Sequence, residues 1–148
     1  MPKVLVFYYS QTGNTEKMAK AVIEGAQSIG NVEVDLRFNV DPEELSQYDA
    51  IIIGVPTYHH SAPLGITRVL EEAAVKRVDL KGKIGATFGS YGWSGEAPRY
   101  VQEILKNRFE MQVYEPPLIA KYAPDQNTLN DCRNLGKRIV QSVVYGGS

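Results

Sequence analysis

The sequence S-Q-T-G-N-T at residues 10–15 directly follows the apolar run V-L-V-F-Y-Y at residues 4–9. The apolar run predicts a buried β-strand, and the polar stretch predicts the turn into a helix that begins near Gly13. The first turn of a helix carries backbone N–H groups without a partner inside the helix, so they can bind an anion. The glycine permits a tight turn, and hydroxyl and amide side chains surround these donors. The stretch therefore predicts a phosphate-binding loop made of Ser10, Gln11, Thr12, Gly13, Asn14 and Thr15.

This loop carries no positive charge, since no lysine or arginine lies between Ser10 and Glu16. A phosphate here would be held by neutral hydrogen bonds and the helix dipole, without an ion pair. The stretch also differs from the Walker A pattern and from the dinucleotide fingerprint G-x-G-x-x-G. A second interpretation is that these residues only cap a helix, because Ser, Thr and Asn are favoured there. Taken alone, the segment supports the two interpretations about equally.

Length and composition limit the classes of protein that are compatible with the chain. The 148 residues fit a single domain, 1–148, and sixteen basic against seventeen acidic side chains give a net charge of −1. This balance argues against nucleic-acid binding. No apolar run approaches the roughly 20 residues of a membrane-spanning helix, and no signal peptide is recognisable, so we expect no membrane insertion and a cytoplasmic location. The single Cys132 excludes an internal disulfide, and no Cys/His spacing predicts a metal site.

Strand-like and helix-like segments alternate along the chain, which predicts a parallel sheet covered by helices on both faces. Strands are expected at residues 4–9, 32–38, 50–55 and 84–89, followed by a broken edge strand at 111–114 and 118–120. Helices are expected at residues 13–29, 66–74, 100–105 and 129–144, where apolar side chains recur with helical spacing. The expected fold class is a doubly wound, five-stranded parallel α/β sheet in three layers.

Ligands of such sheets bind beyond the carboxyl ends of the strands, where the strand order reverses. This rule selects the loops at residues 10–15, 56–63 and 90–98, and the last two read P-T-Y-H-H-S-A-P and S-Y-G-W-S-G-E-A-P. A planar ring could lie between Tyr58 on one side and Trp93 or Tyr91 on the other. Alone, these aromatic residues fit packing on helix ends or contact with another protein better. Together with an uncharged phosphate loop, they favour a planar, phosphorylated ligand.

Over its whole length the sequence resembles a flavodoxin. The resemblance is carried by V-L-V-F-Y-Y-S-Q-T-G-N-T, I-I-I-G-V-P-T-Y and F-G-S-Y-G-W-S-G-E-A, in that order. The last string is especially similar to the flavodoxin module of flavodiiron proteins. The resemblance implies the strand order 2-1-3-4-5, for which flavodoxin is the type example with FMN at the switch point, and it implies FMN as cofactor and one-electron transfer. The implied cofactor-binding residues are Ser10, Gln11, Thr12, Gly13, Asn14, Thr15, Pro56, Thr57, Tyr58, His59, Ser90, Tyr91, Gly92 and Trp93.

The chain departs from the flavodoxin pattern in its charge and in its second loop. Many flavodoxins are strongly acidic, whereas this chain is nearly neutral. Its third loop contains only one acidic residue, Glu96, and fewer negative charges oppose an anionic reduced flavin less, so we predict a less negative reduction potential than that of an acidic flavodoxin. Residues 57–62 contain no glycine, and in many flavodoxins a glycine here allows a peptide flip toward the reduced flavin. His59 and His60 have no cysteine or carboxylate neighbour in sequence, so they do not predict a metal site. The simpler interpretation is that one of them is an exposed side chain. The alternative hypothesis is that one imidazole approaches the flavin, which would make the potential depend on pH.

Three functions are compatible with these observations to different degrees. The resemblance favours an electron carrier that works between redox partner proteins as a monomer or weak dimer, with chemistry supplied by the cofactor. The alternative is an FMN-dependent NAD(P)H or quinone reductase, which would need a second substrate pocket that a short chain has little room to build. A phosphate-regulated signalling domain is disfavoured, because it should have acidic residues after the first and third strands. The resemblance to flavodiiron proteins leaves open a free-standing flavodoxin or one module of a longer protein.

Overall fold

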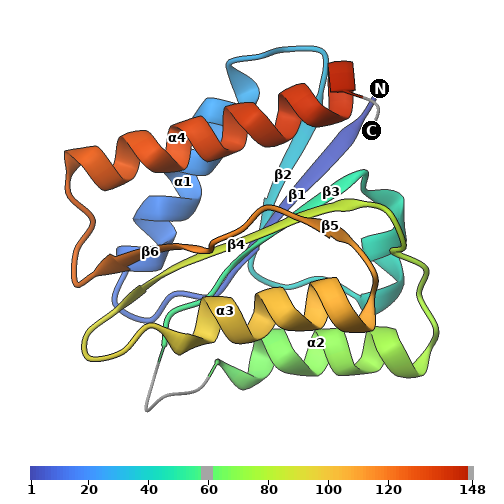
Figure 1. Ribbon diagram of the computed structural model, residues 1–148, viewed down its shortest axis with the longest axis horizontal. Helices are drawn as coiled ribbons and strands as arrows, with labels where there is room; N and C mark the ends of the chain where they lie inside the picture. The colour runs from blue at the N-terminus through green and yellow to red at the C-terminus, as the bar shows by residue number, and fades with distance from the viewer. Residues whose placement is uncertain (58–61, 147–148) are drawn as a thin grey trace.

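A computed structural model describes residues 1–57 and 62–146 (Figure 1). The strands are β1 (Lys3–Tyr8), β2 (Glu33–Arg37), β3 (Ala50–Gly54), β4 (Ile84–Tyr91), β5 (Gln112–Val113) and β6 (Leu118–Lys121). The α-helices are α1 (Asn14–Gln27), α2 (Leu64–Val75), α3 (Glu96–Glu103) and α4 (Gln126–Gln141). A 3-10 helix, η1 (Pro42–Gln47), precedes β3, and the π-helical turns η2 (Ile104–Arg108) and η3 (Ser142–Gly146) extend α3 and α4.

The strands form one parallel sheet in the order β2-β1-β3-β4-β5, which confirms the predicted fold class and strand order. The predicted break in the edge strand is also confirmed. The short strand β5 pairs with the start of β4, and β6 pairs with its end, so two strands share the fifth position. Between them the chain turns away from the sheet at residues 114–117, which include two prolines that cannot donate to a strand ladder.

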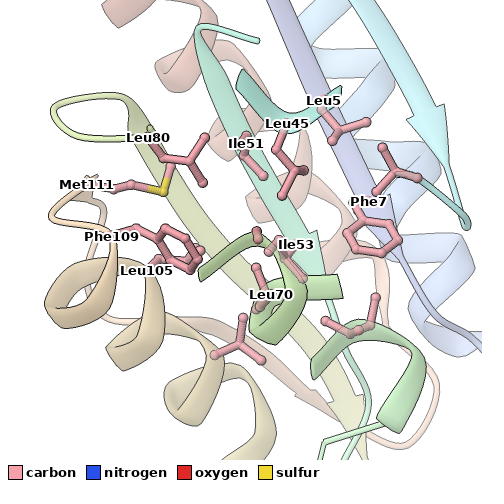
Figure 2. Packing of buried hydrophobic residues seen from close by; sticks show 14 of the residues in the cluster. Leu5, Phe7, Leu45, Ile51, Ile53, Leu70, Leu80, Leu105, Phe109 and Met111 are labelled. Carbon is pink, nitrogen blue, oxygen red and sulfur yellow. The ribbon is translucent and has the colours of Figure 1, made fainter. Parts of the chain in front are cut away.

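Side chains alternate between the two faces of the sheet and fill two separate hydrophobic cores. On β1, for example, Leu5 and Phe7 face one core while Val4 and Val6 face the other. The first core lies beneath α2 and α3, and Figure 2 shows Leu5, Phe7, Ile51 and others packed there. The second lies beneath α1 and α4, which cover the opposite face (Figure 1). Burial on both faces explains why the central strands read as continuous apolar runs.

The pairing register brings the carboxyl ends of four strands to the same edge of the sheet. Tyr8 of β1 pairs with Gly54 of β3, Gly54 pairs with Phe88 of β4, and Phe88 pairs with Leu118 of β6. The segments that follow these strands therefore converge on one end of the molecule. In the parts of the chain that the structure describes, no helix is both long and apolar enough to cross a membrane.

Candidate functional site

A cleft of about 630 Å³ opens at the carboxyl end of the sheet. Its volume lies in the range of small-molecule sites. All the described residues that line it are uncharged, and they come from four segments of the chain: Gln11, Thr12, Asn14, Pro56, Thr57, Ser90, Tyr91, Gly92, Trp93, Ser94 and Tyr122. Nine of the residues predicted from the sequence are therefore brought together in one cleft.

The first segment turns from β1 into α1 through a left-handed glycine. Gly13 has φ +93° at the N-terminal end of the helix, a conformation that favours glycine. The hydroxyl oxygen of Ser10 accepts hydrogen bonds from the backbone N–H groups of Gly13 (3.1 Å) and Glu16 (3.2 Å). The Ser10 side chain therefore stabilises the loop by bonding to its backbone, and the hydroxyl proton of Ser10 remains able to donate to a ligand.

The first turn of α1 still offers unused donors to the cleft. Within the described residues, the backbone N–H groups of Thr12, Asn14 and Thr15 donate to no protein acceptor. Thr12 and Asn14 line the cleft. A phosphate at this position would satisfy these donors and would sit at the positive end of the helix dipole.

Ser10 and Gly13 do not line the cleft itself but a second groove, which shares Gln11 and Thr12 with the cleft. This groove is also lined by Tyr8, Glu16 and the exposed Phe38. The Tyr8 hydroxyl donates to the Glu16 carboxylate at 3.2 Å. Burial and then the charge of Glu16 raise the pKa of Tyr8, so this phenol stays protonated as a donor. The contact holds the Glu16 carboxylate against Tyr8 in this second groove.

Thr15 is buried and joins the first loop to the end of β4. Its hydroxyl oxygen lies 3.0 Å from the hydroxyl oxygen of Ser90 and accepts the backbone N–H of Ser90 at 3.2 Å. Ser90 and Tyr91 were expected in a loop, but β4 continues through both of them. Pairing with β6 extends the strand, because Ser90 pairs with Ala120 and Tyr91 with Lys121.

The second segment runs alongside β4, in contact with its backbone, before it reaches the cleft. A side chain at Gly89 would overlap the carbonyl oxygen of Val55, so only glycine allows this approach. The N–H of Thr57 donates to the carbonyl of Ser90 at 3.2 Å, and its hydroxyl accepts the N–H of Ala97 at 2.9 Å. Thr57 is therefore a buried link between the cleft and the start of α3. The predicted site residues Tyr58 and His59 lie outside the described residues, as does His60.

The mouth of the cleft carries large aromatic side chains. Trp93 is 87% exposed, and Tyr122 is 63% exposed. The sequence did not predict Tyr122 or Ser94 as site residues. Tyr122 directly follows the last residue of β6. The signal that could have identified Tyr122 is the carboxyl-end rule itself, applied to the second half of the broken edge strand.

In the described part of the chain, no group of three or more His, Cys, Asp or Glu side chains could hold a metal ion.

These features define a doubly wound α/β protein with an uncharged cleft at the carboxyl end of its sheet, where such folds bind their ligands. The flavodoxin family model matches residues 6–136, and the chain belongs to the flavodoxin family. Members of this family bind FMN and take part in electron transport, and FMN is the cofactor of this chain. The donors of the first turn of α1 and the aromatic mouth fit such a group.

Relatives of two kinds share this sequence. A flavodoxin of Clostridium beijerinckii is 35% identical, over 90% of this chain and 96% of that protein. A type A flavoprotein, fprA, of Rhodobacter capsulatus is 36% identical, over 95% of this chain but 33% of that protein. A flavo-diiron protein, FprA2, of Clostridium acetobutylicum is 28% identical, over 93% of this chain and 36% of that protein. The chain thus spans about a third of the length of these larger flavoproteins.

Solved structures agree with this assignment. A flavodoxin from the domain Archaea superposes with a TM-score of 0.87 at 36% identity, covering 95% of this chain and 98% of that one. The flavodiiron protein of Giardia intestinalis has the same TM-score at 24% identity and covers 96% of this chain and 36% of that one, which is a likeness of fold.

Proposed function

We propose that this chain is a low-potential electron carrier that accepts electrons from one redox protein and passes them to another. The observation that carries the proposal is the uncharged cleft whose lining includes the solvent-exposed aromatic side chains of Trp93 and Tyr122. FMN supplies the redox chemistry when it is bound. An open mouth allows a partner protein to approach the cofactor without entering the fold. A cytoplasmic location belongs to this proposal, and the free thiol of Cys132 suits a reducing compartment.

In this proposal the cleft residues divide the work of binding. The loop at residues 10–15 holds the phosphate with backbone N–H groups and with the side chains of Ser10, Thr12 and Asn14. Pro56 and Thr57 form one side of the ring site, and residues 90–93 form the other. Gln11, Gly13 and Thr15 complete the first loop, and Thr15 acts mainly by fixing Ser90. Tyr58 and His59 keep the roles that the family resemblance implies.

The test begins with the visible spectrum of the purified protein, reconstituted with FMN if it is colourless. Stepwise anaerobic reduction follows, with dithionite in one series and NADPH in another. We expect bound flavin that accepts electrons from dithionite and is not turned over by NADPH. Rapid NADPH oxidation with a quinone acceptor would contradict the carrier proposal and favour the reductase.

The potential is a second part of the proposal. With a net charge of −1, the protein opposes added negative charge on a reduced cofactor less than a strongly acidic flavodoxin does. We therefore expect a less negative midpoint potential than that of an acidic flavodoxin under the same buffer and salt conditions. A more negative value would overturn this part of the proposal. The small net charge also predicts that the long-range attraction of a charged partner, and with it the rate of docking, depends only weakly on salt.

A further inference from the structure

Tyr122 occupies an unusual position beside the cleft. It follows the last residue of β6, lines the same cleft as residues 90–94, and adopts a left-handed backbone conformation with φ +61°. Bulky L-residues seldom adopt this conformation, because the side chain crowds the backbone. An outlier of this kind persists only where the surrounding structure holds it, and such outliers cluster at ligand sites.

Two contacts hold Tyr122 in place. Its backbone N–H donates to the carbonyl of Tyr91 at 2.6 Å, which continues the pairing between β6 and β4 by one residue. The ammonium of Lys121 lies 5.5 Å from the centre of the Tyr122 ring, within cation–π distance. The left-handed residue therefore comes directly after a paired strand, at the point where the chain borders the cleft.

The edge of the Tyr122 ring lies beside Gly92. A Cβ atom at Gly92 would lie 3.7 Å from Cε1 of Tyr122, an ordinary van der Waals distance, so the ring is a close neighbour of residue 92 at the cleft. Most of the ring nevertheless remains accessible, since Tyr122 is 63% exposed. An aromatic ring that is fixed at its base and open on its outer surface can cover a bound planar group.

We propose that Tyr122 is a further cofactor-contacting residue, and that the left-handed turn after β6 places its ring against the FMN held in the cleft. This inference concerns a fourth segment of the chain, in addition to the three loops of the proposed function. It rests on FMN binding in this cleft, which the wild-type protein tests separately. A competing role for the exposed ring is contact with a partner protein, and affinity for FMN distinguishes the two.

The experiment is a titration of FMN with the cofactor-free protein, followed by the quenching of flavin fluorescence. Tyr122→Leu keeps an apolar side chain but removes the ring, and we expect the dissociation constant for FMN to rise about three- to tenfold. Tyr122→Phe should restore wild-type affinity. Tyr145→Leu is the matched control, because Tyr145 is 70% exposed in η3 and does not line the cleft; it should bind FMN like the wild type.

A second variant guards against misfolding. Tyr122→Gly suits the positive φ, so it should fold while losing the same FMN affinity as Tyr122→Leu. If both variants fold and bind FMN within twofold of the wild type, the inference is wrong. It is also wrong if the variants keep this FMN affinity but react more slowly with a partner protein, because the ring then serves the partner contact. Failure of the wild type itself to bind FMN would instead refute the cofactor assignment on which the proposed function depends.

Discussion

Three buried hydroxyl groups connect the segments around the cleft to one another. Thr15, Thr57 and Ser90 are each less than 9% exposed, and each bonds to a residue that is distant in sequence. The Thr15 hydroxyl bonds to the Ser90 hydroxyl, and the Thr57 hydroxyl accepts the N–H of Ala97, while the backbone N–H of Thr57 donates to the carbonyl of Ser90. These bonds fix the geometry of the cleft before a ligand enters, which lowers the entropy lost on binding.

The Thr15–Ser90 pair should contribute measurably to stability. Thr15→Val preserves the shape of the side chain but leaves the buried N–H of Ser90 without its acceptor and the Ser90 hydroxyl without its partner. We expect the free energy of unfolding of the cofactor-free protein to fall by about 1–3 kcal/mol, the usual penalty for an unsatisfied buried donor. Urea denaturation followed by circular dichroism measures this change.

The control for this substitution is Thr67→Val in α2. The Thr67 hydroxyl bonds only to carbonyl groups of its own helix turn, at 3.3 and 3.5 Å. Its loss should change the free energy of unfolding by less than about 0.5 kcal/mol. Equal stabilities of the two valine variants would show that the buried hydroxyl pair adds nothing to the fold.

At the level of elements, α1 and α4 approach each other through two glycines. A Cβ atom on Gly25 would overlap the carbonyl oxygen of Arg133, and one on Gly136 would overlap that of Val22. The two backbones are therefore in direct contact on one face of the sheet, beside the second core (Figure 1). The sequence shows only that glycine occurs inside two helical patterns, where it lowers helix propensity.

This contact predicts opposite outcomes for two Gly→Ala substitutions. Gly136→Ala must push α4 away from α1, and we expect a loss of about 1–3 kcal/mol in the free energy of unfolding, as for other overpacked cores. Gly65→Ala is the matched control, because a Cβ atom there meets nothing within 4 Å. It should be neutral or stabilising by up to about 1 kcal/mol. Thermal and urea unfolding would compare them, and a Gly136→Ala protein as stable as Gly65→Ala would contradict the close contact.

The start of α4 depends on an ionised carboxylate. The Asp125 side chain accepts the backbone N–H of Thr128 at 2.8 Å, and this bond lowers the pKa of Asp125 below its ordinary value of 3.8. A depressed pKa means that the carboxylate stabilises the fold above the unfolded-state pKa, and that this contribution disappears as the pH falls through the lower, folded-state pKa.

Asp125→Asn removes the negative charge but keeps a side chain that can cap the helix, because asparagine is also a good N-cap residue. The variant therefore tests the contribution of the charge alone. We expect the wild type to be the more stable protein at pH 7 and the difference to shrink as the pH falls below about 4. Thermal midpoints measured between pH 7 and pH 3 would show this convergence. A difference that stays constant over that range would mean that the ionisation of Asp125 does not contribute.

At the scale of the whole molecule, the sequence predicts the sheet better than it predicts the cleft. Apolar runs such as residues 50–54 define central strands, because burial on both faces removes polar positions. The carboxyl-end rule then locates the first three segments of the site. Tyr122 escapes this procedure because it follows the edge strand, which is not one of the strands beside the switch point between β1 and β3.

The partners of the buried hydroxyls could not be predicted either. Thr15 and Ser90 are 75 positions apart, and only the assembled sheet brings them within hydrogen-bonding distance. In sequence, Thr15 has the same character as Thr12, although one is buried and the other is exposed at the cleft. A local pattern identifies which residues can bond to a phosphate, but tertiary packing determines which of them bond to the protein instead.

The buried thiol of Cys132 offers a test of how FMN binding couples to the stability of the whole fold. Cys132 is fully buried in the second core, and burial, assisted by Asp131, raises its pKa to about 12. Alkylation by iodoacetamide at pH 8 therefore requires an opening of the structure that exposes the thiol. If that opening is global unfolding, FMN at 100 times its dissociation constant should slow labelling about 100-fold, because the cofactor binds only the folded state. Labelling of glutathione with and without FMN controls for the reagent. A rate for Cys132 that does not change with FMN would mean that α4 opens alone while the cleft, at the end of the sheet, stays intact.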